Sequence, residues 1–245
     1  MDRAYTEILV VRHGETAWNA TGRIQGHMDV ELNEVGRQQA ASVCCFLERL
    51  SQEPEISAVY SSDLKRSLET AETIAASFGK FEVIKDPDLR ERHLGDVQGL
   101  LFREAAKVHP EAYRAFSSRR TNQVIPGGGE SLDQLYHCAT SSLQRISQKH
   151  TGKRVVVVTH GGVIRALYRR AWSTRFRGSI LNTSVNIFHI SGDGVWTIKV
   201  WGDVTHLHQT GQYSMSGFVV NKNIICCYFC CHLNKSAMSL KLIRD

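Results

Sequence analysis

Short runs of β-branched and aromatic residues alternate along the chain with longer stretches in which apolar residues follow a helical period. The short runs predict strands over residues 7–11, 56–62, 81–84, 154–160, 184–190 and 195–201. The longer stretches predict helices over residues 33–51, 64–78, 131–150 and 162–172. Because strands that alternate with helices are typical of parallel sheets with helical crossovers, the pattern predicts an α/β fold. We expect a mostly parallel central sheet with helices on both faces.

Two segments stand out within this pattern. The run "VVVV" at 155–158 is continuously apolar, which favours a central strand buried on both faces. Residues 110–130 are the least regular part of the core and end in "PGGGES", which predicts a loop or a lid. Ser131, at the end of that motif, is a candidate cap for the following helix.

Composition and charge limit the class of protein. The chain has 245 residues, of which 42% are hydrophobic and 22% charged, an ordinary globular composition. The net charge of +6 suits a small anionic substrate but is too diffuse to indicate a nucleic acid. The first residues, "MDRAYTEILVV", enter a strand without the apolar stretch of a signal peptide, so a cytoplasmic protein without a membrane partner is expected.

Two of the predicted strands end in the same way. "LVVRHGE" places His13 after an apolar strand and before Gly14, and "VVVVTHGG" does the same for His160 and Gly161. In open α/β sheets, ligands bind beyond the carboxyl ends of the strands, so the two histidines meet if their strands are neighbours. The helix that begins at Gly161 would offer free N–H groups to an anion.

Charged residues at two other predicted strand ends complete this constellation. Arg66 lies in the first turn of the helix after "AVYSS", where a cation is unfavourable unless it meets an anion. Arg12 and Arg66 could grip a phosphoryl group, and the His13 imidazole is a competent nucleophile. Glu91, in the charged stretch "DLRERHLGDVQG", could supply the proton for a leaving alkoxide. These residue types are what phosphoryl transfer through a histidine requires, without a metal ion or cofactor.

The stretch "VRHGETAWN" followed by "GRIQG" resembles the signature of the histidine phosphatase superfamily, which includes cofactor-dependent phosphoglycerate mutase. The resemblance continues through "YSSDLKRSLETA", "PGGGES" and "VVVVTHGGVIR" and covers roughly residues 6–202. It implies the three-layer fold of these mutases, His13 as the phosphorylated nucleophile and Glu91 as the proton donor. It further implies that the following residues contact the phosphoryl group or face the substrate: Arg12, Asn19, Gln25, Gly26, Arg66, His160.

The sequence departs from the mutases at two positions. Where mutases that share "ERH" hold the substrate with a tyrosine and a lysine, this chain has Leu94 and Phe102. Losing such contacts favours hydrolysis of the phosphohistidine over retention of an intermediate. Arg119 and Arg120 are candidates to replace this grip. We therefore expect a phosphatase for a small phosphorylated metabolite of carbohydrate metabolism, with a mutase or a non-catalytic binding module as alternatives.

The pattern predicts one catalytic domain over residues 1–203 and an atypical, poorly ordered tail over 204–245. Seven cysteines without framework spacing indicate reduced thiols, and Cys44 and Cys45 fit core packing in a helix. Cys227 and Cys230 form a single C-x-x-C, and three histidines lie nearby in sequence, but one such pair is weak evidence for zinc. A homodimer is possible.

Overall fold

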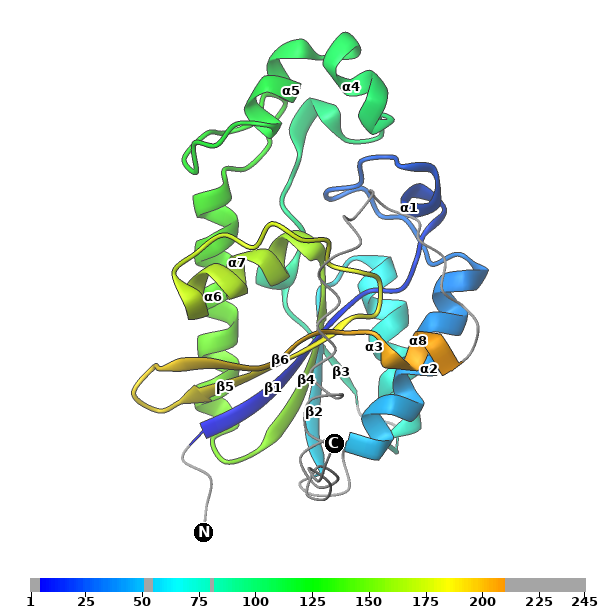
Figure 1. Cartoon of the computed structure of the whole chain (residues 1–245), viewed down its shortest axis with the longest axis vertical. Helices are drawn as coiled ribbons and strands as arrows, with labels where there is room; N and C mark the ends of the chain where they lie inside the picture. Colours follow the sequence, from blue (N-terminus) through cyan, green and yellow to red (C-terminus); the bar gives the residue numbers. More distant parts are fainter. Residues whose placement is uncertain (1–4, 51–54, 80–81, 210–245) are drawn as a thin grey trace, which may run out of the picture.

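Six strands form one sheet, in the order β3-β2-β4-β1-β5-β6, within the residues that this computed structural model describes, 5–50, 55–79 and 82–209. They are β1 (Tyr5–Arg12), β2 (Ile56–Ser61), β3 (Val83–Lys85), β4 (Arg154–Thr159), β5 (Val185–Ser191) and β6 (Trp196–Asp203). The first four run parallel to one another, β5 is antiparallel to β1, and β6 is antiparallel to β5 (Figure 1). The expected α/β class with a mostly parallel sheet is confirmed.

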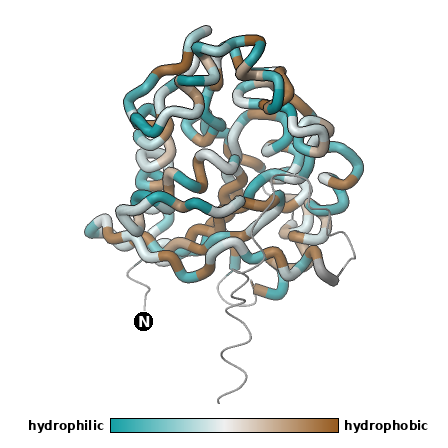
Figure 2. Tube along the Cα trace, turned by 45° about the horizontal axis from the view of Figure 1, so that its top comes forward, coloured by the Kyte–Doolittle hydropathy of each residue, from teal (hydrophilic) through white to brown (hydrophobic). Residues whose placement is uncertain are grey.

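Helices cover both faces of this sheet. α6 (Leu132–Lys149) and α7 (Gly161–Trp172) lie on one side, and α2 (Glu34–Leu50) and α3 (Lys65–Ser77) lie on the other (Figure 1). Figure 2 shows the hydrophobic stretches of the trace running through the middle of the molecule. The predicted cap is present, since Ser131 Oγ accepts a hydrogen bond from Gln134 N at 3.1 Å.

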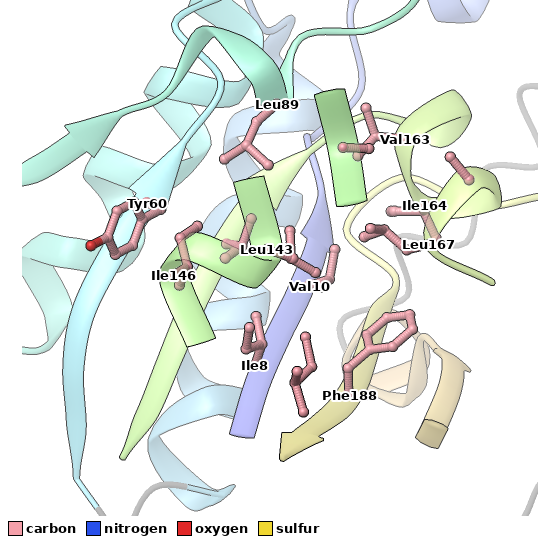
Figure 3. Packing of buried hydrophobic residues seen from close by; sticks show 14 of the residues in the cluster. Ile8, Val10, Tyr60, Leu89, Leu143, Ile146, Val163, Ile164, Leu167 and Phe188 are labelled. Atoms are coloured by element: carbon pink, nitrogen blue, oxygen red, sulfur yellow. The ribbon is translucent and has the colours of Figure 1, made fainter. Parts of the chain in front are cut away.

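The strand alternation divides the core into two layers. Ile8 and Val10 of β1 face α6 and α7, where they pack near Leu143 and Phe188 (Figure 3). Leu9 and Val11 face α2 and α3 instead, so every core position of β1 is buried. All six residues of β4 are also buried, which confirms the prediction of a central strand made from "VVVV".

The segment of residues 86–130 starts beside α6 and continues into a small helical cap above the carboxyl ends of the parallel strands, at the top of Figure 1. It contains the short helices η1 (Pro87–Leu89), η2 (Gly95–Val97), α4 (Phe102–Val108) and α5 (Pro110–Phe116). The loop predicted for 110–130 is therefore wrong for its first third, which is helical, and the alternative of a lid stays a prediction. The helices around Ala105, Ala112 and Ala115 have only two turns each, so their apolar residues repeat too few times for a helical period to be recognised in the sequence.

The other differences concern element ends and single positions. Gly161 already belongs to α7, and the strand predicted at 81–84 is described only from Val83. Cys44 is buried as expected, but the prediction for Cys45 is wrong because it is exposed. Adjacent residues of a helix point in directions about 100° apart, so one of the two must face away from the core.

The chain leaves the sheet through a further short helix, α8 (Thr205–Gln209), which lies beside α2 (Figure 1). The ring of His206 packs against Phe46, with a centroid distance of 5.5 Å. The start of the segment expected to be an irregular tail is therefore helical, and the boundary at residue 203 stays a prediction. The cysteines at 227 and 230 lie outside the described residues. None of the described helices combines the length and apolar composition that crossing a membrane requires.

Candidate active site

The two predicted histidines meet because their strands are adjacent and in register. β1 and β4 pair in parallel so that Arg12 lies opposite Thr159, and His13 N donates to Thr159 O at 2.9 Å. The next residue of each strand end is a histidine, and the two imidazole ring centroids lie 5.2 Å apart. His13 is 3% exposed and His160 is fully buried. The strand order thus confirms the juxtaposition that the sequence only implied.

The imidazole of His13 is oriented by its own backbone. Its Nδ1 lies 2.7 Å from Gly14 O and donates to this carbonyl, which leaves the lone pair on Nε2. Burial, together with the positive charges of Arg66 and Arg12, lowers the pKa of His13 well below 6.5. The ring is therefore neutral at pH 7, the state in which an imidazole nitrogen can attack phosphorus.

The neighbouring glycine allows this close packing. A β carbon on Gly14 would lie 2.5 Å from Gly36 O of α2, a contact that no side chain can make. Gly14 N donates to Thr70 Oγ1 of α3 at 3.1 Å. The turn after β1 thus contacts both α2 and α3, and these contacts fix the position of His13.

Arg66 is almost completely buried and is held at its far end. Its Nη1 and Nη2 donate to Met28 O and Gly26 O at 2.9 and 2.8 Å, whereas its Nε has no partner among the described residues. Burial lowers the pKa of Arg66 to about 10, a value at which the guanidinium stays charged.

Two further buried nitrogen atoms are left without a partner in the same way. Arg12 donates through Nη1 to Ile180 O at 2.5 Å, but its Nε has no partner in the described part of the chain. Nε2 of His160 lies 2.9 Å from Ser62 Oγ, while its Nδ1 is also without a described partner. Because buried polar groups normally have partners, this concentration of unpaired nitrogen atoms indicates a site for an external acceptor.

Glu91 reaches the site from the cap. Its two carboxylate oxygens accept hydrogen bonds from Arg92 N and Gly162 N, each at 2.9 Å. The second bond joins the cap to the first turn of α7. A β carbon on Gly162 would lie 2.0 Å from Glu91 Oε1, so this approach requires glycine.

The residues from the loop after β1 surround this cluster. Asn19 Oδ1 accepts a hydrogen bond from Thr16 N at 3.1 Å and thereby caps α1 (Ala17–Thr21). Gln25 Oε1 accepts from the Thr16 hydroxyl at 3.2 Å. Gly26 contributes its carbonyl to Arg66, as described above. The side chains of Asn19 and Gln25 thus contact the loop itself, and their contact with a substrate stays a prediction.

Three residues at the site were not identified from the sequence. Gly162 accommodates Glu91, and Asn182 Nδ2 donates to His13 O at 2.9 Å. Arg165 lies one turn beyond Gly161 on α7, and it affects the pKa of Arg12 as a nearby positive charge. The spacing from Gly161 to Arg165 was a usable signal, because residues four apart share a helix face.

The two positions that differ from the mutases are apolar in the structure, and the role proposed for Arg119 and Arg120 stays a prediction. Leu94 and Phe102 pack in the apolar cluster of the cap together with Val97 and Ile125. Arg119 and Arg120 are exposed on the far segment of the cap, where Arg119 O accepts a hydrogen bond from Arg175 Nη2 at 3.2 Å. No group of His, Cys, Asp and Glu in the described residues could hold a metal ion.

The site combines a neutral imidazole, a second imidazole and two guanidiniums held by backbone carbonyls. This set of groups can bind a phosphoryl group and transfer it through an imidazole nitrogen. Residues 8–204 match the sequence profile of the histidine phosphatase superfamily (branch 1), and the chain belongs to this superfamily. It is a histidine phosphatase.

The chain is similar to proteins that are named as a phosphatase or as mutase-like. The chain is 64% identical to Phosphoglycerate mutase-like protein 4 of Arabidopsis thaliana over 89% of this chain and 93% of that protein. It is 52% identical to the Metal-independent phosphoserine phosphatase of the same plant, over 84% and 85% of the two chains. Among solved structures, a phosphoserine phosphatase from Entamoeba histolytica in complex with 3-phosphoglyceric acid has a TM-score of 0.70 and 27% identity, covering 82% of this chain and 99% of that one.

Proposed function

We propose that the protein hydrolyses a small carboxylated phosphomonoester, with O-phospho-L-serine as the first candidate, through a phosphohistidine on His13. The observation that carries this proposal is the group of unpaired buried nitrogen atoms on Arg12, Arg66 and His160 around the neutral His13 ring. The choice of substrate rests on the relative named as a metal-independent phosphoserine phosphatase.

In the first step, the lone pair of His13 Nε2 forms a bond to phosphorus, and the bond from phosphorus to the ester oxygen breaks. Glu91 in its protonated form gives its proton to the leaving oxygen, which departs as the alcohol. Arg12 and Arg66 stabilise the charge on the phosphoryl oxygens during this transfer. His160 completes the set of donors from the opposite strand end.

In the second step, water attacks the phosphohistidine. The Glu91 carboxylate takes one proton from this water, and the resulting oxygen forms a bond to phosphorus while the bond to His13 Nε2 breaks. Phosphate leaves, the imidazole is again neutral, and Glu91 is again protonated. Each cycle therefore consumes one water and regenerates both groups.

The test is to trap the intermediate. With ³²P-labelled phosphoserine and a rapid quench that avoids acid, label should appear on His13 and disappear in His13→Ala. Steady-state phosphate release should survive dialysis against EDTA, since the guanidinium groups supply the positive charge that a metal ion supplies elsewhere. Label on a serine or cysteine, or activity that depends on added metal, would contradict the proposal.

A mutase is the second candidate, because one relative is named phosphoglycerate mutase-like. Against this alternative, Leu94 and Phe102 are packed in the cap cluster and offer no charge to a reorienting intermediate. With 3-phosphoglycerate and a bisphosphoglycerate primer, we expect phosphate release to exceed isomerisation. A cytoplasmic location, a role in carbohydrate metabolism and a homodimer stay predictions.

A further inference from the structure

One short loop between α7 and β5 holds two arginines of the site side by side. Gly178 O accepts a hydrogen bond from Arg165 Nη2 at 3.1 Å, and Ile180 O accepts one from Arg12 Nη1 at 2.5 Å. Two carbonyls that lie two residues apart thus orient two guanidinium groups from different elements, one at the end of β1 and one on α7.

The two guanidiniums converge above the start of α7. A β carbon placed on Gly161 would lie 3.4 Å from Arg165 Nη1 and 3.9 Å from Arg12 Nε. Both nitrogen atoms are therefore within 4 Å of one point beside the first turn of the helix. Glycine leaves that point empty, and the N-terminal end of α7 adds a positive potential there.

Three guanidiniums, those of Arg12, Arg66 and Arg165, lie around the carboxylate of Glu91, and Glu15 and Asp29 act on them as further negative charges. The one carboxylate that raises the pKa of Arg165, among the described residues, is Glu91, whereas burial lowers it. Burial lowers the pKa of Arg12, as do the charges of Arg165 and Arg66, whereas Glu91 and Glu15 raise it. When Glu91 carries the proton that it donates in the reaction, it no longer neutralises any of these groups. Like charges in such proximity favour the binding of anionic groups from outside.

A phosphoryl group would contact only part of this cluster. It would lie between His13 Nε2, His160 and the unpaired Nε atoms of Arg12 and Arg66. Arg165 extends the row of guanidiniums beyond Arg12 and is open to solvent, while burial still lowers its pKa. Its side chain is therefore accessible to a ligand.

We infer that Arg165 is the specificity-determining residue that binds the carboxylate of the substrate, next to the phosphoryl group held by Arg12 and Arg66. This inference rests on the proposed function. A guanidinium suits this role because its planar nitrogen fork matches a carboxylate, and the bond to Gly178 O fixes its orientation. Phosphomonoesters that carry a carboxylate a few bonds from the ester oxygen are then preferred over those that lack it.

The test compares phosphoserine with phosphoethanolamine, which differ by the carboxylate alone. In Arg165→Met, we expect kcat/KM for phosphoserine to fall about 10- to 100-fold, mostly through KM, because a charge-assisted contact is lost. With phosphoethanolamine, kcat/KM should change less than about 3-fold. Arg165→Lys should recover part of the phosphoserine activity, since it keeps the charge but loses the fork.

Arg170→Met serves as the matched control. Arg170 lies on the same helix, is exposed, and likewise donates to a loop carbonyl, Gly194 O at 3.4 Å. It should leave the ratio of the two substrates unchanged. An equal loss with both substrates in Arg165→Met would assign Arg165 to the phosphoryl group or to the fold and overturn the inference. An unchanged ratio and unchanged rates would overturn it as well.

A binding measurement separates this inference from the proposed function. In the His13→Ala background, which cannot form the phosphohistidine, isothermal titration calorimetry gives the dissociation constants of both compounds. Adding Arg165→Met should weaken phosphoserine about 10- to 100-fold and leave phosphoethanolamine nearly unaltered. If the wild-type chain releases phosphate from neither compound, the proposed function fails while the binding difference still supports Arg165. Equal effects on the binding of both compounds would contradict the role of Arg165.

Discussion

The site is assembled from two regions that are held in place by different means. The phosphoryl side comes from the sheet and from α3, and its side chains are fixed by strand register and burial: Arg66 is 1% exposed and His13 is 3% exposed. The cap side supplies Glu91, which is only half-buried and is positioned by two backbone N–H groups. The nucleophile is therefore part of the core, whereas the proton donor depends on a contact between two separate parts of the fold.

This difference separates phosphate binding, which depends on the sheet, from proton donation, which depends on the cap. The phosphate-binding side chains at the strand ends are held as firmly as the sheet, because a shift of His13 would break the pairing of β1 with β4. The cap has its own small apolar cluster around Val97 and Ile125 and contacts α7 through Gly162 N. Changes on the cap side should accordingly impair chemistry without unfolding the sheet.

The largest expected effect is that of Glu91→Gln. An amide cannot donate the proton, so kcat for phosphoserine should fall about 10²- to 10⁴-fold. With p-nitrophenyl phosphate the leaving group needs no proton, so stopped-flow absorbance should show a fast burst of nitrophenolate followed by slow turnover. Glu111→Gln, an exposed carboxylate on α5, is the control and should behave as wild type. A variant that shows neither the loss nor the burst would rule out Glu91 as the acid and base.

Gly162→Ala tests the contact between the two regions. The added β carbon would lie 2.0 Å from Glu91 Oε1 and must displace this carboxylate, so we expect kcat to fall about 10-fold or more. Gly192→Ala is the control, since a β carbon there has no neighbour within 4 Å. Because Gly162→Ala acts through Glu91, it should add little to Glu91→Gln in the double variant. Additive losses would mean that the glycine has another role.

The histidines of the two regions should titrate at different pH. Burial lowers the pKa of His27, beside Glu91, below 6.5, and the pKa values of His13 and His160 are lowered further. On acidification from pH 8, nuclear magnetic resonance of the histidine rings should show His27 charging first, with His13 and His160 neutral to lower pH. His27→Gln assigns its signal, and the reverse order would contradict the burial argument.

The same shifts predict how stability depends on pH. The unfolded chain takes up protons near pH 6.5, while the buried imidazoles of the folded chain do not. The free energy of unfolding should therefore decrease as the pH falls below 6.5, by about 1.4 kcal/mol per pH unit for each such histidine. Urea unfolding at pH 7.5 and 5.5 measures this slope.

The smallest effect is expected from removing the chain after Gln209. All residues of both regions lie before this point, as does α8, whose His206 lies 3.1 Å from the Thr183 hydroxyl next to Asn182. We propose that the catalytic unit ends here, so the shortened chain should release phosphate from phosphoserine at close to the full-length rate. Folded but inactive protein would show that the remaining residues contribute to the site.

Much of the phosphoryl side could be predicted from the sequence. The endings "VVRHG" and "VVTHG" place a histidine and a glycine directly after apolar strands, and local patterning specifies this arrangement because strand period and turn residues act over a few positions. Arg66 was found for the same reason, as a cation in the first turn of a helix. The helices α4 and α5 escaped prediction because each spans only two turns.

What the sequence by itself determined is which residues end the strands and which chemistry they can perform. Only the tertiary structure decided that β1 and β4 are neighbours and that Glu91 meets the N–H of Gly162. Arg165 is an intermediate case, because its spacing from Gly161 predicts its helix face, whereas its orientation beside Arg12 depends on the hydrogen bond to Gly178 O. Contacts between distant residues depend on packing and on hydrogen bonds across elements, and no local period in the sequence encodes them.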